Sequence, residues 1–315
     1  MLKLMKADFH RLKKNKLFWI FSVLLFVYFL YDAVSMTWNF NIFSQAAAQE
    51  TFRQRFEYET AYINFIVVIL FSCIFSGSEF SSKTVRNKIF CGHTRTEIYL
   101  SALTVNMAAS AVFIFPVVFT EIAAACFGFT KFYIGFILFL IALLLSFSAT
   151  SLSLAAAFIT GSRFAALIIS GLVIFSMFYT SYYAERVLAI PREYREIISV
   201  NGEPYIEQTV LFDDDVVEYG FRPNPDYPSE EKKKLCSFIC DILPGSQFRK
   251  LAKIAFDNKS DYHIADFRDD EGNVHVREIK GAEDLNEKFS LYGTVIFIFA
   301  VNALGIIVFN KKELK

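Results

Sequence analysis

The sequence carries no excess of charge of either sign and few of the residues that perform catalytic or metal chemistry. Its 315 residues include 32 Lys and Arg, 32 Asp and Glu, four His and five Cys. This balance gives no support to a nucleic-acid partner. There is no CxxC pair, no Cys/His ligand spacing, and no Ser-His-Asp, His-rich or HExxH arrangement. We therefore expect neither an intrinsic catalytic site nor a metal site.

The sequence also lacks GxxxxGK[ST], the glycine-rich loop that cradles nucleotide phosphates. The chain is therefore not expected to bind ATP in the P-loop manner. Any work that it performs with ATP requires a second protein.

Two of the five cysteines, Cys236 and Cys240, lie four residues apart in LCSFIC. This spacing puts both on one face of a helix. A disulfide between them is one interpretation, and two buried thiols are the favoured one, because a regular helix does not direct the two Cβ atoms suitably for a bridge.

What the sequence has in abundance is apolar residues, 54% of the chain, with 37 Phe. A soluble domain has roughly 45–50%, so we expect an integral membrane protein. A membrane-spanning helix needs about 20 mainly apolar residues. Six segments qualify, at 17–36, 61–77, 98–126, 132–160, 164–184 and 289–310.

Lys and Arg collect before the first segment, between the second and third, between the fourth and fifth, and after the sixth. Six crossings put all these regions on one side. The positive-inside rule then places both termini in the cytosol of a cell membrane crossed several times, and a bacterial inner membrane is the expected one.

The long segment 185–287 falls on the opposite side and is acidic. Asn201-Gly202 and the alternating residues around 270–273 predict hairpins, and Ser229 predicts the start of a helix. The expected fold is a membrane all-α bundle of six helices, formed by 1–184 and 288–315, with an amphipathic N-terminal elbow helix. A small α+β extracytosolic domain, 185–287, is inserted between the fifth and sixth helices.

A polar stretch from Ser76 to Leu103 separates the second and third crossings. It holds two Ser/Thr-x-x-Glu patterns, Ser76 to Glu79 and Thr94 to Glu97, each of which predicts a helix start. The stretch is expected to form a short helix at the membrane surface, followed by the start of the third crossing.

This short helix would have an apolar edge (Phe80, Val85, Ile89 and Phe90) and an exposed basic edge (Lys83, Arg86 and Lys88). Such a helix can dock into a groove of a partner. In the alternative interpretation Glu79 only caps the helix and the basic residues only hold the loop in the cytosol.

The N-terminal stretch places Leu2, Met5, Phe9 and Leu12 on one helical face, with lysines facing away. This pattern predicts an amphipathic helix lying in the headgroup layer of the bilayer. A basic flank that only fixes topology is equally compatible with it.

Two residues of the third crossing stand out. Pro116 should kink the helix, and Glu121 is an ionisable residue in apolar sequence. Both are candidates for a substrate path, although Glu121 is also close enough to the outer surface to be solvated.

The residues of the central stretch and of the N-terminus resemble a known family, the membrane permeases of type-2 ABC transporters. The resemblance lies in DFHRLKKNKLFWI, which enters the first crossing, and in FSGSEFSSKTVRNKIFCGHTRTEIYLSAL. It covers roughly the first third of the chain and the topology. Permeases that export or resist antimicrobial peptides and peptide toxins are most similar to this arrangement.

The resemblance implies that the loop between crossings two and three is a coupling helix that sits in a cleft of an ATP-binding subunit. ATP and Mg would then be bound by that partner, and a second permease copy or close paralogue would complete the exporter of an amphipathic or hydrophobic substrate such as a peptide. The implied contact residues are Glu79, Lys83, Thr84, Arg86 and Lys88, with Phe80, Val85 and Ile89 packing the helix. The insertion of about a hundred residues departs from the short hairpin of many relatives.

A rival hypothesis is a membrane sensor or immunity protein whose acidic outer domain binds an extracellular peptide. A cationic peptide would suit the acidic runs at 213–215 and 269–271. A solvated loop surface is the simpler interpretation of those acids.

Overall fold

The computed structural model describes residues 1–40, 61–126, 132–190, 192–200, 203–204, 217–246, 262–268, 274–280 and 292–313. The chain divides into two compact units. The first consists of Met1–Tyr179, Asp241–Phe256 and Ser290–Lys315, and the second of Thr180–Cys240 and Asp257–Phe289.

Within the described residues, six helical segments are long and apolar enough to cross a membrane. The protein is therefore a multi-pass membrane protein, as the composition indicates. The segments are α2 (Lys16–Phe40), α4 (Ala61–Ser81), α6 (Arg95–Ile114) with α7 (Val117–Cys126), α8 (Phe132–Thr160), α9 (Arg163–Leu188) and α12 (Tyr292–Lys311).

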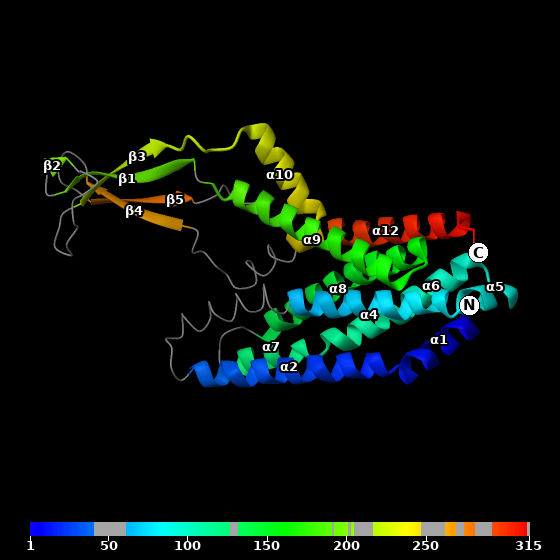
Figure 1. Cartoon of the computed structure of the whole chain (residues 1–315). Coiled ribbons are helices and arrows are strands. Elements are labelled where there is room, and N and C mark those ends of the chain that lie inside the picture. The colour runs from blue at the N-terminus through cyan, green and yellow to red at the C-terminus, as the bar shows by residue number, and fades with distance from the viewer. Residues whose placement is uncertain are drawn as a thin grey trace. The chain divides into compact units, whose positions relative to one another are not determined.

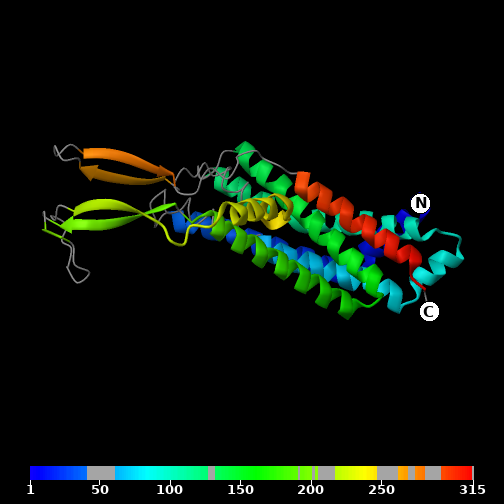
Figure 2. The same cartoon turned by 90° about the horizontal axis from the view of Figure 1, so that it is seen from above.

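Helix α8 lies at the centre of the first unit, where it packs against α4, α6, α7 and α12. Figures 1 and 2 show these helices running side by side. Buried Ala155, Ala156 and Ala157 belong to α8. Small side chains of this kind let helices approach closely, which is what drives their packing in a membrane.

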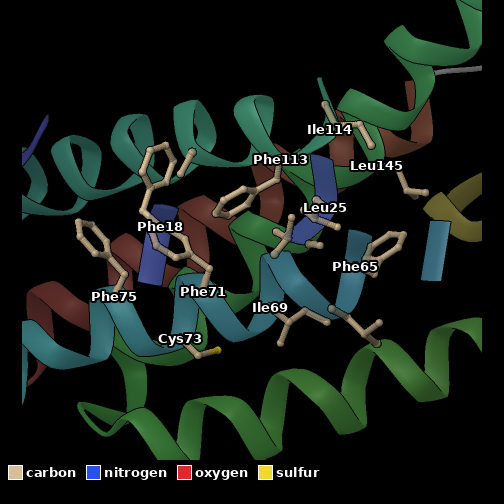
Figure 3. Close-up of a cluster of buried hydrophobic side chains, with 14 of the residues drawn as sticks. Phe18, Leu25, Phe65, Ile69, Phe71, Cys73, Phe75, Phe113, Ile114 and Leu145 are labelled. Atoms are coloured by element: carbon tan, nitrogen blue, oxygen red, sulfur yellow. The ribbon is translucent and has the colours of Figure 1, made fainter. Parts of the chain in front are cut away.

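The main core is built from aromatic and aliphatic residues of α2, α4, α6 and α8 (Figure 3). Phe71 stacks on Phe75 with ring centroids 5.2 Å apart and meets Phe113 edge to face at 5.1 Å. Phe18 of α2 packs against the same Phe113 ring at 5.6 Å. Such aromatic pairs contribute about 0.5–1.5 kcal/mol beyond their buried area.

Polar side chains also join the helices. Asn106 of α6 donates to Ser76 Oγ of α4 at 2.9 Å, and Asn64 of α4 donates to Ser146 Oγ of α8 at 2.6 Å. Asn302 of α12 accepts from Tyr99 Oη at 3.0 Å and donates to Ser151 Oγ at 2.9 Å. These bonds fix the rotation of the helices about their axes, which apolar contacts alone do not specify.

The kink expected at Pro116 is confirmed. Helix α6 ends at Ile114 and α7 begins at Val117. Proline has no backbone N–H and its ring collides with the preceding turn, so the helical ladder is interrupted there. The third crossing therefore consists of two helices.

One predicted helix start is wrong. Ser76 is not an N-cap, because it lies within α4, which continues to Ser81. Its hydroxyl is buried and accepts from Asn106 instead. The second prediction is confirmed: Thr94 and Glu97 form a capping box that opens α6, three residues before the expected crossing at 98.

The N-terminal helix α1 (Leu2–Lys14) buries Leu4, Asp8 and Leu12. Of the face predicted from sequence, Leu12 is buried, Met5 and Phe9 are half-buried, and Leu2 is 82% exposed. The packed face is thus rotated from the expected one, and it carries a carboxylate that the apolar pattern does not reveal.

The second unit contains strands β1 (Glu193–Val200), β2 (Glu203–Pro204) and β3 (Val217–Pro223) in the antiparallel order β2-β1-β3. Strands β4 (Tyr262–Arg268) and β5 (Val274–Lys280) form an antiparallel pair. Asn201 and Gly202 lie outside the described residues. That segment 185–287 is an extracytosolic domain stays a prediction.

Helix α10 (Glu230–Ile242) follows Ser229, whose Oγ accepts from the backbone N–H of Lys232 at 3.4 Å. Cys236 and Cys240 are both buried, and the disulfide considered for them does not form. They pack against Ala184 and Val187 of α9. Burial raises the pKa of the Cys236 thiol, an effect that nearby Lys232 partly offsets.

Candidate functional site

A short helix, α5 (Thr84–Phe90), connects α4 to α6 at the end of the first unit that holds both chain ends (Figure 1). Lys83 separates α4 from α5 and adopts a left-handed conformation with φ 59°. Gly92 follows α5 with φ +87°, a conformation open to glycine without steric cost. The two turns reverse the chain within a few residues, so α5 is held between two spanning helices.

The inner face of α5 is apolar. Val85 is 2% exposed and packs in a cluster with Leu4 of α1, Ile98 of α6, Phe158 of α8 and Phe309 of α12, with Ile89 and Phe80 against it. Val85, Ile89 and Phe80 therefore pack as the apolar edge predicted from their spacing. Phe90 was predicted on the same edge and is exposed instead, because it lies about 100° further around the helix than Ile89. Four other helices meet α5 through this cluster.

Four charged side chains form an ion network between α1, α4 and α5. Glu79 of α4 pairs with Arg11 Nη1 at 2.5 Å and with Lys88 Nζ at 2.9 Å. Lys88 also pairs with Asp8 at 2.8 Å. Ser101 of α6 donates to the other Asp8 oxygen at 2.7 Å.

Burial gives this network its importance. Glu79 is 1% exposed and Asp8 3%. Two carboxylates and two cations balance one another, which offsets the cost of removing the charges from water. The Arg11 guanidinium also lies 4.0 Å from the Phe75 ring centroid. The network ties the N-terminal helix to the helix that precedes α5 and to α5 itself.

This geometry revises the roles expected for two residues. Glu79 and Lys88 were predicted to contact a partner, but their charged groups are engaged inside the chain. They position α5. Asp8, Arg11 and Ser101 complete the network and were missed, although Asp8 is spaced four residues from both Leu4 and Leu12 on the packed face of α1.

The outer face of α5 is exposed. It consists of Lys83, Arg86, Asn87 and Phe90, the last of which is 76% exposed. The Arg86 guanidinium carbon lies 5.8 Å from the Phe90 ring centroid. A large exposed aromatic beside an arginine is the composition enriched at protein interfaces. Thr84 is half-buried, and its hydroxyl lies 2.7 Å from that of Ser82.

Two basic side chains close the ends of neighbouring helices at the same end of the unit. Arg95 Nη1 donates to the carbonyls of Phe309 at 2.7 Å, Asn310 at 3.2 Å and Lys312. Lys312 Nζ donates to the carbonyls of Phe158 and Ile159 at 3.2 and 2.9 Å. Desolvation lowers the pKa of Lys312. The last carbonyls of α8 and α12 are thus satisfied by side chains from other elements.

The side chain of Glu121 and the acidic runs at 213–215 and 269–271 lie outside the described residues. Among the residues that are described, no group of three His, Cys, Asp or Glu side chains could hold a metal ion.

Comparison of the chain with protein-family models, with curated proteins and with solved structures found no match.

Proposed function

We propose that the chain is the membrane permease subunit of an ATP-binding-cassette exporter, with α5 as the helix that receives force from a separate ATP-binding subunit. The observation that carries the proposal is the two-sided build of α5. Its inner face is fixed to four helices, and its outer face presents Arg86 and Phe90 to solvent.

A coupling element must be both accessible and rigidly attached, and α5 meets both requirements. Force applied to Phe90 and Arg86 would pass through Val85 to the apolar cluster. It would also pass through Lys88 to Asp8 and Glu79. The load therefore reaches α1, α4 and α6 together, so these helices would tilt as a group against a second permease copy or paralogue.

The absence of a P-loop supports a separate source of ATP and Mg. The charge distribution supports a cytosolic position for α5. Lys3, Lys6, Lys13, Lys14 and Lys16 lie in or beside α1, at the same end of the unit as α5. In this orientation α1 lies in the headgroup layer as an elbow, and 185–287 is an extracytosolic α+β domain. The exported substrate would be amphipathic or hydrophobic, such as a peptide.

The test compares substitutions on the two faces of α5 in the full chain, purified from its own host. The wild type should co-purify with a P-loop ATPase, and the complex should hydrolyse ATP. R86E combined with F90S should reduce both by at least about tenfold, the equivalent of about 1.4 kcal/mol and within the range of interface hot spots. K13E combined with K14E, a larger charge change on exposed residues of α1, should leave both unchanged.

The proposal fails if no ATPase accompanies the wild type. It also fails if R86E with F90S retains both the partner and the hydrolysis, or if K13E with K14E loses them.

A further inference from the structure

Helix α10 carries a row of large apolar side chains that remain exposed among the described residues. Leu235 is 59% exposed, Phe238 62% and Ile242 39%. Their spacing puts these three side chains on one face of α10. The opposite face is buried and carries Lys233, Cys236 and Cys240. A continuous exposed apolar row on a helix otherwise rich in charge indicates an interaction surface.

The contact between α10 and α9 indicates how deep this apolar row lies in the bilayer. Helix α9 has 26 residues and is thus about 39 Å long, whereas the hydrocarbon core of a bilayer is about 30 Å thick. With Arg163 at one boundary of the core, the last turns of α9 lie at the opposite headgroup layer. Cys236 and Cys240 pack against Ala184 and Val187 in those turns.

The tyrosines of α9 also indicate that its last turns lie at the headgroup layer. Tyr179, Tyr182 and Tyr183 are 64%, 47% and 50% exposed. Tyrosines gather where a span meets the headgroups, because the ring is apolar and the hydroxyl is polar. Lys232 of α10 lies 5.9 Å from the Tyr183 ring centroid. The first half of α10 is therefore at headgroup depth.

The residues that follow α10 belong to the first unit. Pro244 and Gly245 line an apolar pocket together with Phe65 of α4, Phe178 of α9 and Phe297 of α12. All three phenylalanines belong to membrane-spanning segments. The residues directly after α10 therefore lie beside membrane-spanning helices.

From this we infer that α10 is an interfacial helix at the headgroup layer where α9 ends, with Leu235, Phe238 and Ile242 in contact with lipid acyl chains. Three acidic and three basic residues give the helix no net charge: Glu230, Glu231, Asp241, Lys232, Lys233 and Lys234. Its membrane contact depends on apolar area and needs no anionic lipid. The inference rests on the membrane spans and not on transport.

Tryptophan quenching by brominated lipid tests this directly. The two native tryptophans, Trp19 and Trp38, are replaced by Phe, and F238W is introduced into the full chain. The protein is reconstituted in nanodiscs of zwitterionic lipid, one copy per disc, with bromine placed either near the headgroup or near the bilayer centre. F238W should be quenched at least about twofold more than S237W, a control at the same depth whose side chain lies about 100° around α10 from Phe238. Bromine near the headgroup should quench F238W more strongly than bromine near the bilayer centre.

L235W provides the same readout if F238W does not fold. Equal, weak quenching of all three variants would show that the row faces water, and would overturn the inference. So would stronger quenching by the deep bromine, which would make α10 part of the bundle. A third outcome would assign the row to a second copy of the chain. In that case no quenching occurs in single-copy discs, and the Trp emission indicates an apolar environment only when two copies share a disc.

Discussion

At the scale of single residues, the best-defined feature is the carboxylate of Glu79, which is held by two cations in a nearly solvent-free site. A buried ion pair adds little net stability compared with apolar residues, but its rupture leaves unpaired charges behind. Glu79 therefore matters to the fold around α5 whether or not a partner binds there.

E79A should lower the stability of the chain by about 3–5 kcal/mol, because Arg11 and Lys88 lose their shared partner. Unfolding can be followed in detergent through the reactivity of Cys73, which is 0% exposed, in a chain with the other four cysteines replaced by Ser. E97Q is the control, because Gln preserves the capping box of Thr94. An E79A midpoint equal to that of E97Q would contradict the structural role of the network.

A second residue-scale prediction concerns Gly305 of α12. A Cβ at this position would meet Tyr99 Oη at 2.5 Å and Cζ at 2.9 Å, and Tyr99 is 0% exposed and bonded to Asn302. G305A should therefore cost about 1–3 kcal/mol through overpacking. Y99F should recover part of this loss in the G305A background, which a double-mutant cycle measured by the same thiol assay would show. Strict additivity of the two changes would contradict the proposed clash.

At the scale of elements, the side-chain caps of Arg95 and Lys312 hold the helix ends beside α5. R95A should release the last carbonyls of α12, because one guanidinium group binds those of Phe309 and Asn310, together with that of Lys312 just beyond the helix. Amide exchange in the last turn of α12 should then accelerate about tenfold, corresponding to about 1.4 kcal/mol for a lost charge-assisted bond. Exchange in the middle of α12 is the internal control. An unchanged rate at Phe309 to Lys311 would rule out this capping role.

The helices and their ends show which features of this fold can be predicted from sequence. The capping box of Thr94 and the break at Pro116 are local, and both were predicted correctly. Ser76 carries the same pattern as Thr94, but helix α4 continues past it to Ser81, and its hydroxyl accepts a hydrogen bond from Asn106. A capping pattern indicates a helix start only where the chain before it is not helical.

The candidate site was also predictable only where it depends on residues close together in the sequence. The amphipathic pattern of α5 identified the packed Val85 and Ile89 and the exposed Lys83 and Arg86, since those depend on spacing within a few residues. It was wrong for Phe90, which is 76% exposed, and for Lys88, which is engaged inside the chain. The partner of Lys88 could not be found this way, because Asp8 is 80 residues distant in sequence. Spacing alone also could not show that Glu79 and Lys88 face each other, since the turn at Lys83 sets their approach.

At the scale of the whole molecule, the spans and the basic residues together define an orientation that can be measured. Cys91 and Cys126 are both exposed. Cys91 directly follows α5, whereas Cys126 ends α7, beyond the full length of the third crossing. If both termini are cytosolic, a membrane-impermeant maleimide should label Cys126 in intact cells and label Cys91 only after permeabilisation.

Each thiol is tested alone, with the other four cysteines replaced by Ser. A chain that keeps only buried Cys73 is the control and should react only in denaturant. Labelling of Cys91 in intact cells would invert the topology and place α5 beyond the reach of any cytosolic ATPase.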